Sequence, residues 1–146
     1  MTNNIQRIKD RLSTHKLRST PVRKAVLSAF YNAAGTALAS RDIEENLIYL
    51  DRITLYRTLK SFEQKGIIHT VIDGTGVNKY ALCRHHQCDH EGHHDVHAHF
   101  FCVTCEQTTC LEDTKVSQPS LTEGFEIISA QLVLSGICNR CSQSQS

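Results

Sequence analysis

Two Cys-x-x-Cys pairs constrain this chain more than any other feature of its sequence. The first is Cys102-Val103-Thr104-Cys105 and the second is Cys138-Asn139-Arg140-Cys141. Four thiolates are the ligand set of a closed tetrahedral zinc site, and a two-residue spacer lets both sulfurs of a pair reach one ion. We therefore expect a structural zinc bound by Cys102, Cys105, Cys138 and Cys141.

The distance between the two pairs predicts what this zinc would connect. The 32 intervening residues exceed the spacing of a compact zinc ribbon, so the ion would tie the strands of a domain to its C-terminal end. Two disulfides, or four thiols without metal, are the alternative. The N-terminus has no pattern of a secretion signal, and Cys-x-x-Cys pairs in such chains more often bind metal.

The composition indicates two small domains with different partners. The 146 residues suffice for one ordinary domain or two small ones. Residues 1–82 carry thirteen Lys and Arg against seven Asp and Glu, whereas residues 83–146 carry three against eight. All seven Cys and seven of the nine His lie in the second part. The first part is therefore suited to a polyanion and the second to metal. No apolar run approaches the roughly 20 residues of a membrane span, so we expect a cytoplasmic protein with reduced cysteines.

Helical patterns fill residues 3–65. A helix is expected over residues 3–14, with Ile5, Ile8 and Leu12 facing inward. Thr20-Pro21 predicts the start of a second helix, and Ser40 is expected to cap a third that runs from Arg41 to about Leu50.

The fourth predicted helix carries the candidate DNA-binding residues. Asp51 is its expected N-cap and Gly66 its stop. Its apolar positions are Ile53, Leu55, Leu59 and Phe62. The remaining face offers cationic, polar and aromatic side chains suited to phosphates and base edges in a major groove: Arg52, Thr54, Tyr56, Arg57 and Lys60.

A hairpin follows, and it predicts the fold class. Alternating segments Ile67–Ile72 and Val77–Leu82 flank Asp73-Gly74-Thr75-Gly76. Helices followed by a hairpin form a winged helix-turn-helix, although a helical core without a DNA partner has the same pattern. We expect an α+β protein with three parts: a winged-helix domain (1–82), a His- and Cys-rich hinge (83–96) and a zinc-stapled domain (97–146). In the last part, strands are expected at 97–103, 107–111 and 125–134, with a short helix at 117–123.

The order of several motifs resembles one family. Thr54-Leu55-Tyr56-Arg57-Thr58-Leu59, the block His97-x-His99-x-x-Cys102-x-x-Cys105 and Gly136-x-Cys138-x-x-Cys141 are similar to segments of the ferric uptake regulator family of bacterial metal-dependent repressors. The resemblance runs from about residue 18 to 141. It implies an N-terminal winged-helix domain, a C-terminal α/β dimerisation domain, a structural four-cysteine zinc and a sensing metal site between the domains.

The resemblance also implies the sensing ligands. Cys83 matches a thiolate of the zinc uptake regulators, at a position where iron sensors usually have a carboxylate. His69, His97 and His99 match sensing histidines of that branch. A thiolate with imidazoles suits zinc, whereas iron sensors use more oxygen and nitrogen. Cys110 stands where some relatives have a glutamate, so it is either a second thiolate ligand or part of a remodelled site.

Two further features of the sequence bear on metal binding. A third metal site found in some relatives is not expected, because Val96, Ala98 and Ala130 occupy its positions. His90-Glu91-Gly92-His93-His94 fits the H-E-x-x-H pattern of zinc hydrolases, but the central glycine and polar flanks disfavour the required helix. Six residues of the hinge either bind extra zinc or form part of a solvated loop, and both alternatives remain open. These residues are His85, His86, Cys88, His90, His93 and His94.

We expect a homodimeric, zinc-responsive repressor of zinc-uptake genes that binds operator DNA. It would hold one structural and one regulatory Zn²⁺ per chain, and it would have no catalytic residues, small-molecule substrate or membrane partner. An iron- or manganese-responsive regulator of the same family is the main alternative. A zinc hydrolase and a purely structural zinc module are remote ones.

Overall fold

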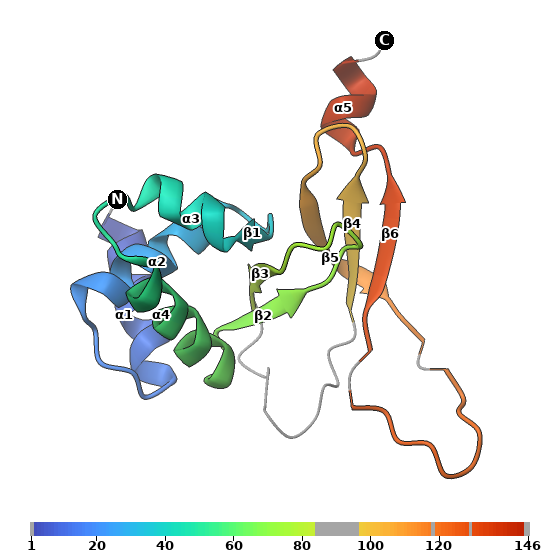
Figure 1. Ribbon diagram of the computed structural model, residues 1–146, viewed down its shortest axis with the longest axis horizontal. Coiled ribbons are helices and arrows are strands. Elements are labelled where there is room, and N and C mark those ends of the chain that lie inside the picture. The colour runs from blue at the N-terminus through green and yellow to red at the C-terminus, as the bar shows by residue number, and fades with distance from the viewer. Residues whose placement is uncertain (1, 84–96, 118, 129, 145–146) are drawn as a thin grey trace.

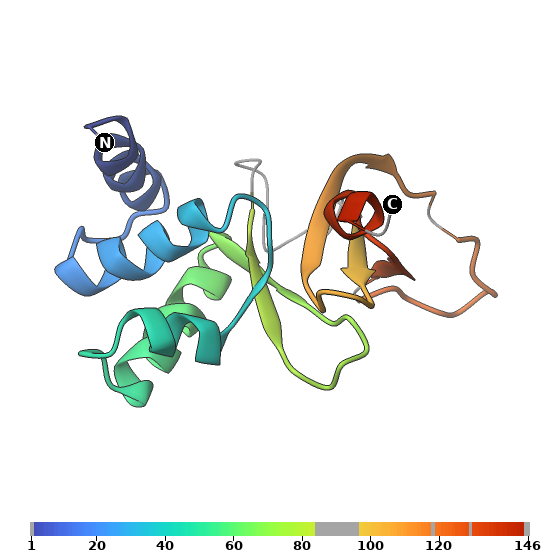
Figure 2. The same ribbon diagram turned by 90° about the horizontal axis from the view of Figure 1, so that it is seen from above.

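The computed structural model describes residues 2–83, 97–117, 119–128 and 130–144, and it consists of a helical N-terminal half and a C-terminal half built on a sheet (Figure 1). The N-terminal half (residues 2–83) contains α1 (Thr2–Thr14), α2 (Pro21–Asn32), β1 (Leu38–Ala39), α3 (Ser40–Asn46), α4 (Arg52–Gln64), β2 (Ile68–Val71) and β3 (Lys79–Leu82). The C-terminal half (residues 97–144) contains β4 (His97–Cys102), β5 (Thr108–Lys115), β6 (Leu132–Gly136) and α5 (Asn139–Ser144). The β2–β3 hairpin lies between the helices and the C-terminal sheet (Figure 2).

Local capping chemistry sets the starts of α2 and α4. The hydroxyl of Thr20 accepts a hydrogen bond from the backbone N–H of Arg23 at 3.2 Å, and Pro21 occupies the first helical position. The Asp51 carboxylate accepts hydrogen bonds from the hydroxyl of Thr54 at 2.7 Å and from the N–H of Thr54 at 2.9 Å, and these contacts lower the pKa of Asp51. Helix α4 ends before Gly66, whose φ of 74° is a left-handed conformation that glycine adopts without strain.

A continuous apolar core joins the helices to the hairpin. Helix α1 contributes Leu12, α2 contributes Leu27, and α4 contributes Phe62, and each of these side chains is fully buried. Ile67 and Ile68 extend the same core to β2. The hairpin is thus rigidly attached to the helices, and a side chain on β2 moves with helix α4.

The N-terminal sheet has the strand order β1-β3-β2, and all its pairs are antiparallel. Thr70 of β2 pairs with Tyr80 of β3, as the hairpin prediction requires. The two-residue strand β1 was not predicted. It adds a third strand on the open edge of β3.

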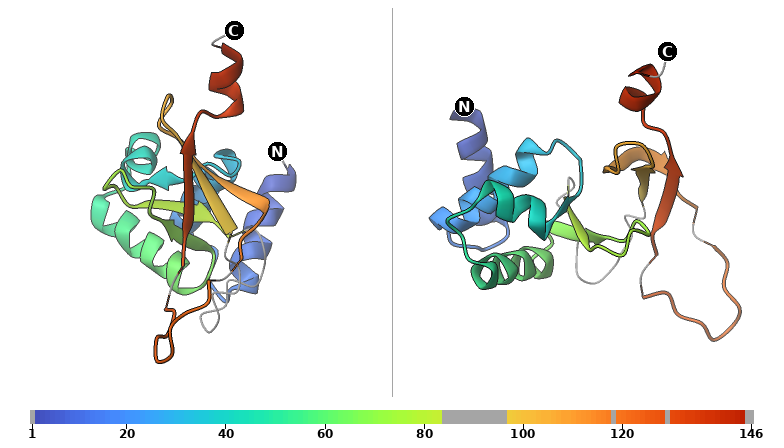
Figure 3. Two further views of the ribbon diagram at one scale, coloured as in Figure 1. Left: turned by 90° about the vertical axis from the view of Figure 1, so that its right-hand side faces the viewer. Right: turned by 45° about the horizontal axis from the view of Figure 1, so that its top comes forward.

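The C-terminal sheet has the order β5-β4-β6. Strand β4 is antiparallel to β5 and parallel to β6 (Figure 3). The parallel pairing places Cys102 opposite Gly136. A Cβ on Gly136 would lie 3.0 Å from the ring of Phe100, so a larger residue at this position would require the ring to shift. This pairing brings the two Cys-x-x-Cys segments to the same end of the sheet.

The third helix differs from the prediction. Its N-cap is Ala39 rather than Ser40, and the Asp42 carboxylate accepts a hydrogen bond from the N–H of Ala39 at 2.8 Å. It ends at Asn46 instead of Leu50, because the side-chain amide of Asn46 bonds the carbonyl of Asp42 and Leu47 leaves the helical conformation. Ile48 is consequently 86% exposed rather than buried. Two other positions of predicted apolar stripes, Ile5 and Ile53, are also exposed.

The segment between β5 and β6 also differs. No helix forms over the described residues of 117–123, where Pro119 removes a backbone donor from a segment already too short to be stable alone. The strand expected over 125–134 is limited to β6, because only Leu132–Gly136 pair with β4. Helix α5 (Asn139–Ser144) was not predicted.

The predicted α+β class, with a winged-helix N-terminal domain and a small C-terminal α/β domain, is confirmed. The boundaries at 1–82, 83–96 and 97–146 stay a prediction, and residues 84–96 lie outside the described part of the chain. Among the described helices, none is both long and apolar enough to cross a membrane.

Candidate metal centres and nucleic-acid interface

The four cysteines of the two Cys-x-x-Cys pairs form a cluster beyond the end of β4. The sulfurs of Cys102, Cys105, Cys138 and Cys141 all lie within 4.8 Å of one another. The sulfurs of Cys105 and Cys138 are 4.0 Å apart. Thiolates around a tetrahedral zinc are separated by about 3.8 Å. The donor set and its spacing therefore fit a structural metal ion.

Backbone amides prepare this cluster for a cation. The N–H of Cys138 donates to the sulfur of Cys102 at 3.3 Å. Backbone N–H groups of Cys105 and Cys138 lower the pKa of Cys102 to about 6. The neighbouring sulfurs, that of Cys138 first, raise the pKa of Cys141 to about 12. A bound cation would stabilise all four sulfurs as thiolates, because it would offset the repulsion between negative charges that lie this close together.

A second cluster lies where the hairpin meets the C-terminal sheet. His69 of β2, His99 of β4 and Cys110 of β5 each offer a ligand atom, and these atoms lie within 4.8 Å of one another. His99 and Cys110 are register partners on adjacent strands, so their side chains share one face. His69 reaches them from the other half of the chain, with its Nε2 3.2 Å from Nε2 of His99. His99 is 2% exposed, so the cluster is largely shielded from water.

Cys83 lies at the other edge of the His69 imidazole. Its sulfur is 3.3 Å from Nδ1 of His69, whereas Nε2 of the same ring faces His99. The two ring nitrogens point in different directions, so one ion bound at Nε2 of His69 would not also contact Cys83 in this arrangement. Cys83 is therefore adjacent to the cluster but not part of it.

His97 begins β4, and its side chain lies outside the described part of the chain. A register irregularity between His97 and Ala98 interrupts the strand there, so the face of His97 does not follow from that of His99. The roles of His69, Cys83, His97, His99 and Cys110 as regulatory ligands stay predictions. The six other His and Cys residues of the hinge also lie outside the described residues.

Helix α4 presents most of the predicted DNA-binding side chains to solvent. Arg52, Tyr56, Arg57 and Lys60 are exposed. Thr54 is different, because its hydroxyl donates to the Asp51 carboxylate at 2.7 Å and so belongs to the helix cap. Arg52 is held near Glu44 of α3, with 3.3 Å between Nε and Oε2. An ion pair this exposed is weak and readily exchanged for a phosphate.

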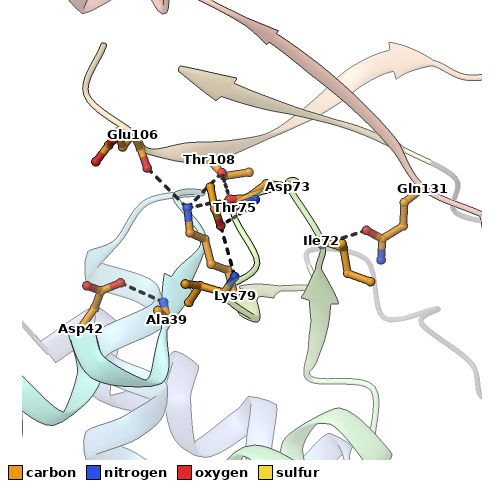
Figure 4. A network of polar contacts seen from close by, with 10 residues as sticks. Ala39, Asp42, Ile72, Asp73, Thr75, Lys79, Glu106, Thr108 and Gln131 are labelled. Carbon is orange, nitrogen blue, oxygen red and sulfur yellow. Dashed lines mark hydrogen bonds and ion pairs between the residues drawn. The ribbon is translucent and has the colours of Figure 1, made fainter. Parts of the chain in front are cut away.

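A polar network across the two halves was missed from the sequence. Asp73 follows β2, Lys79 begins β3, and Thr108 begins β5, and their side chains meet in a buried contact (Figure 4). Asp73 was assigned to the hairpin turn by the Asp73-Gly74 pair. No pattern in the sequence indicates that Asp73 is buried or that its partner Thr108 lies 35 residues away.

Comparison with known proteins agrees with this geometry. Residues 14–135 match the model of the ferric uptake regulator family. The ferric uptake regulation protein of Synechococcus elongatus is 28% identical over 156 aligned positions, which cover 99% of both chains. The zinc uptake regulation protein of Mycobacterium tuberculosis is 28% identical over 92 positions, 60% of this chain and 64% of that one.

Solved structures show the same fold. A zinc uptake regulator in complex with zinc and DNA superposes with a TM-score of 0.69 at 19% identity, covering 99% of this chain and 96% of the other. The family match spans most of the chain; it includes helix α4 and the cluster of His69, His99 and Cys110, and it ends before the second Cys-x-x-Cys pair. This protein belongs to the ferric uptake regulator family of metal-responsive transcription regulators.

Proposed function

We propose that this protein is a dimeric repressor that binds operator DNA in response to zinc and controls zinc-uptake genes. The observation that carries the proposal is the cluster of His69, His99 and Cys110, which joins imidazole and thiol donors from both halves of the chain. As a member of a family of transcription regulators, the protein is not an enzyme. The hydrolase interpretation of residues 90–94 is therefore set aside.

The donor set supports zinc over iron. A thiolate is a soft ligand that suits Zn²⁺, whereas the carboxylate found at the position of Cys110 in some relatives suits Fe²⁺ better. Cys83, 3.3 Å from His69, is a second thiol within the same region. The names of the relatives point to both metals, so iron or manganese is the alternative that the experiment below must exclude.

The positions of the ligands support a conformational response. His69 is fixed to the helical core through β2, whereas His99 and Cys110 belong to the C-terminal sheet. An ion bound by all three would hold the two halves together, and this is the chemistry that zinc would supply. The orientation of helix α4 relative to the C-terminal half would then depend on metal. By linkage, DNA that prefers the same orientation tightens metal binding equally.

The exposed face of α4 supports DNA as the partner. Arg57 and Tyr56 are available for base edges, and Lys60 for phosphates. The excess of six positive charges within residues 1–82 adds a sequence-independent attraction to DNA.

The C-terminal half supports a dimer. Several large apolar side chains of β6 and of the segment that leads into it are solvent-exposed in the single chain: Phe125 (70%), Ile127 (46%), Ile128 (84%), Leu132 (38%) and Leu134 (40%). A soluble monomer seldom exposes so many neighbouring apolar groups. A second copy of the chain would cover them, and two α4 helices would then address two half-sites. A repressor of this kind acts in the cytoplasm.

The metal is tested by measuring DNA binding in separate arms with Zn²⁺, Fe²⁺ and Mn²⁺ at buffered free concentrations. A DNA duplex is first selected from a random pool in each arm, so that no metal is favoured in advance. We expect specific binding with zinc at the lowest free concentration, and two zinc ions per chain by metal analysis. Binding that responds to iron or manganese and ignores zinc would refute the zinc assignment.

A further inference from the structure

Three kinds of contact lie side by side where the hairpin meets the C-terminal sheet. His69, Val71 and Asp73 are alternate residues, so they lie on one side of β2 and of the two residues that follow it. His69 contacts the candidate metal cluster. Val71 is fully buried in a small apolar cluster with Ala37 and Ala81, against which Cys110 packs. Asp73 enters the polar network (Figure 4).

Asp73 is the centre of this polar network. Its Oδ2 lies 2.6 Å from Nζ of Lys79 and accepts a hydrogen bond of 2.6 Å from the hydroxyl of Thr108. Its Oδ1 accepts from the hydroxyl of Thr75 at 2.6 Å and from the N–H of Thr75 at 3.1 Å. The Asp73 side chain is fully buried and that of Lys79 is 12% exposed. Every acceptor position of the carboxylate is thus used, which is how a buried charge is tolerated.

Thr108 and its neighbours connect the network to the C-terminal half. Lys79 reaches the carbonyl of Glu106 and the hydroxyl of Thr108, each at 3.4 Å, and lies 5.4 Å from the centre of the Phe101 ring. The carbonyl of Thr108 accepts from the N–H of Ala37 at 2.8 Å. Two bonds with Gln131 add to the junction, one from the N–H of Ile72 and one to the carbonyl of Thr70.

The network and the metal cluster use the same two structural elements. Thr108 and Cys110 lie two residues apart on β5, and Asp73 and His69 lie four residues apart on β2 and its extension. A separation that broke the contact of Asp73 with Thr108 would also carry His69 away from Cys110. The polar contact and the metal cluster therefore form in the same arrangement of the two halves.

We propose that the Asp73–Lys79–Thr108 contact is an interdomain lock that aligns the metal cluster and thereby sets its zinc affinity. The proposal rests on the proposed function for the metal cluster and adds residues that do not touch the metal. Because none of its three side chains is among the candidate metal ligands, the lock adds its own free energy to the arrangement in which His69, His99 and Cys110 are close. A ligand that binds one arrangement gains affinity in proportion to the population of that arrangement.

The chemistry of the lock suits an interface that opens. An apolar contact of the same size would expose hydrophobic surface on separation and would hold the halves together permanently. Asp73, Lys79 and Thr108 regain hydration when they separate from one another, so the closed arrangement is favoured only modestly. A modest bias leaves the equilibrium responsive to metal.

Thr108→Val tests the lock, with Thr109→Val as the matched control. Valine keeps the shape of threonine, and Thr108→Val removes only the hydroxyl that bonds Asp73. Thr109 makes no side-chain hydrogen bond with any residue that the structure describes. Zinc affinity of the regulatory site is measured in the full-length protein by competition with a chromophoric chelator. We expect Thr108→Val to weaken it about tenfold and Thr109→Val to leave it unchanged.

A second readout does not depend on zinc sensing. Amide hydrogen exchange at Ala37 and Cys110, whose N–H groups bond Thr108 and Gly35 across the junction, should be faster in Thr108→Val than in Thr109→Val. Zinc in the four-cysteine cluster should stay at one equivalent in both variants. Asp73→Asn, which keeps the side-chain shape, should weaken regulatory zinc binding more than Thr108→Val because it leaves Lys79 without its carboxylate.

Equal or tighter zinc affinity in Thr108→Val, with unchanged exchange at Ala37 and Cys110, would overturn the lock. If Thr108→Val did not fold, zinc affinity and amide exchange would be measured on Asp73→Asn instead. Weaker zinc binding with faster exchange would support the lock, and no change in either would overturn it. A wild-type chain that bound only the four-cysteine zinc would refute the proposed function and the tuning of zinc affinity. In that case the exchange data would still show whether Thr108 joins the two halves.

Discussion

The imidazoles of His69 and His99 meet across the two halves of the chain, with their Nε2 atoms 3.2 Å apart. Two imidazole nitrogens bound to one tetrahedral zinc are separated by about 3.3 Å. This spacing is thus close to the one that a shared ion requires. The rings are tilted by 50° to each other, so they do not stack.

The structural zinc is the most direct prediction to check. Cys105→Ser should remove about one tightly held zinc per chain and cause unfolding or dissociation of the C-terminal half. The reason is that zinc binding to a four-cysteine site supplies folding free energy, on the order of 10 kcal/mol in small domains. Metal analysis and sedimentation measure both effects. A stable dimer with unchanged zinc content would contradict the assignment.

DNA recognition by α4 predicts different effects for two of its cations. Arg57→Ala should cost about 1–3 kcal/mol of specific binding, because a base contact is lost. Lys60→Ala should weaken binding to all sequences alike and reduce the salt dependence. Lys65→Ala, at the C-cap of the helix, removes the same charge and serves as the control. Fluorescence anisotropy at several salt concentrations distinguishes the three. An Arg57→Ala variant as specific as the Lys65→Ala control would show that α4 does not read bases.

The apolar surface near β6 predicts a dimer interface. Leu134→Arg should weaken self-association at least tenfold, since a charge would be buried against the second copy. Ile48→Arg changes a more exposed apolar residue in the N-terminal half and should leave association intact. Sedimentation velocity over a concentration series provides the measurement. Identical association of the Leu134→Arg variant and the wild type would mean that another surface pairs the chains.

The ionisation of Asp73 gives a pH prediction. Burial raises the pKa of Asp73, but hydrogen bonds from Lys79, Thr108 and Thr75 outweigh this and hold the pKa well below the ordinary 3.8. A carboxylate whose pKa is lowered by folding contributes stability fully above the unfolded value and loses that contribution as pH falls through the folded value. The lock should therefore be constant from pH 8 to pH 5.

The carboxyl carbon shift of Asp73 in NMR spectra, assigned by comparison with Asp73→Asn, should not titrate in that range. Regulatory zinc should leave at a higher pH than any change at Asp73, because thiols and imidazoles must lose protons to bind it. A titration midpoint of Asp73 above 3.8 would contradict the buried contact.

Features set by local chemistry were predictable from the sequence. The caps at Thr20 and Asp51, the stop at Gly66 and the two cysteine pairs each depend on residues close together in the chain. The exposure of Ile48 and Ile53 was not predictable, because helical periodicity identifies an apolar face but not whether protein or solvent lies beside it. The length of β6 depends on which of its residues pair with β4, and the periodicity of residues 125–134 does not specify that pairing.

The candidate sensing site was predictable only in part. His69, Cys83, His97, His99 and Cys110 were selected through resemblance, and the structure brings three of them together. The position of Cys83 at the far edge of the His69 ring depends on a side-chain orientation that no sequence pattern specifies. Asp73 and Thr108 were missed because their contact spans 35 residues and two domains. Such contacts follow from the packing of whole elements.

The central claim is that metal bound between the two halves controls DNA binding. The most direct measurement is anisotropy of a selected DNA duplex across buffered free zinc, with wild type and Cys110→Ser compared. We predict that zinc raises the DNA affinity of the wild type on the order of 100-fold, equivalent to about 3 kcal/mol of coupling. Cys110→Ser should keep its fold, its dimer and its structural zinc but lose this response. Equal zinc midpoints for the two proteins would exclude Cys110 from the site. DNA binding by the wild type that does not change with zinc would contradict the account.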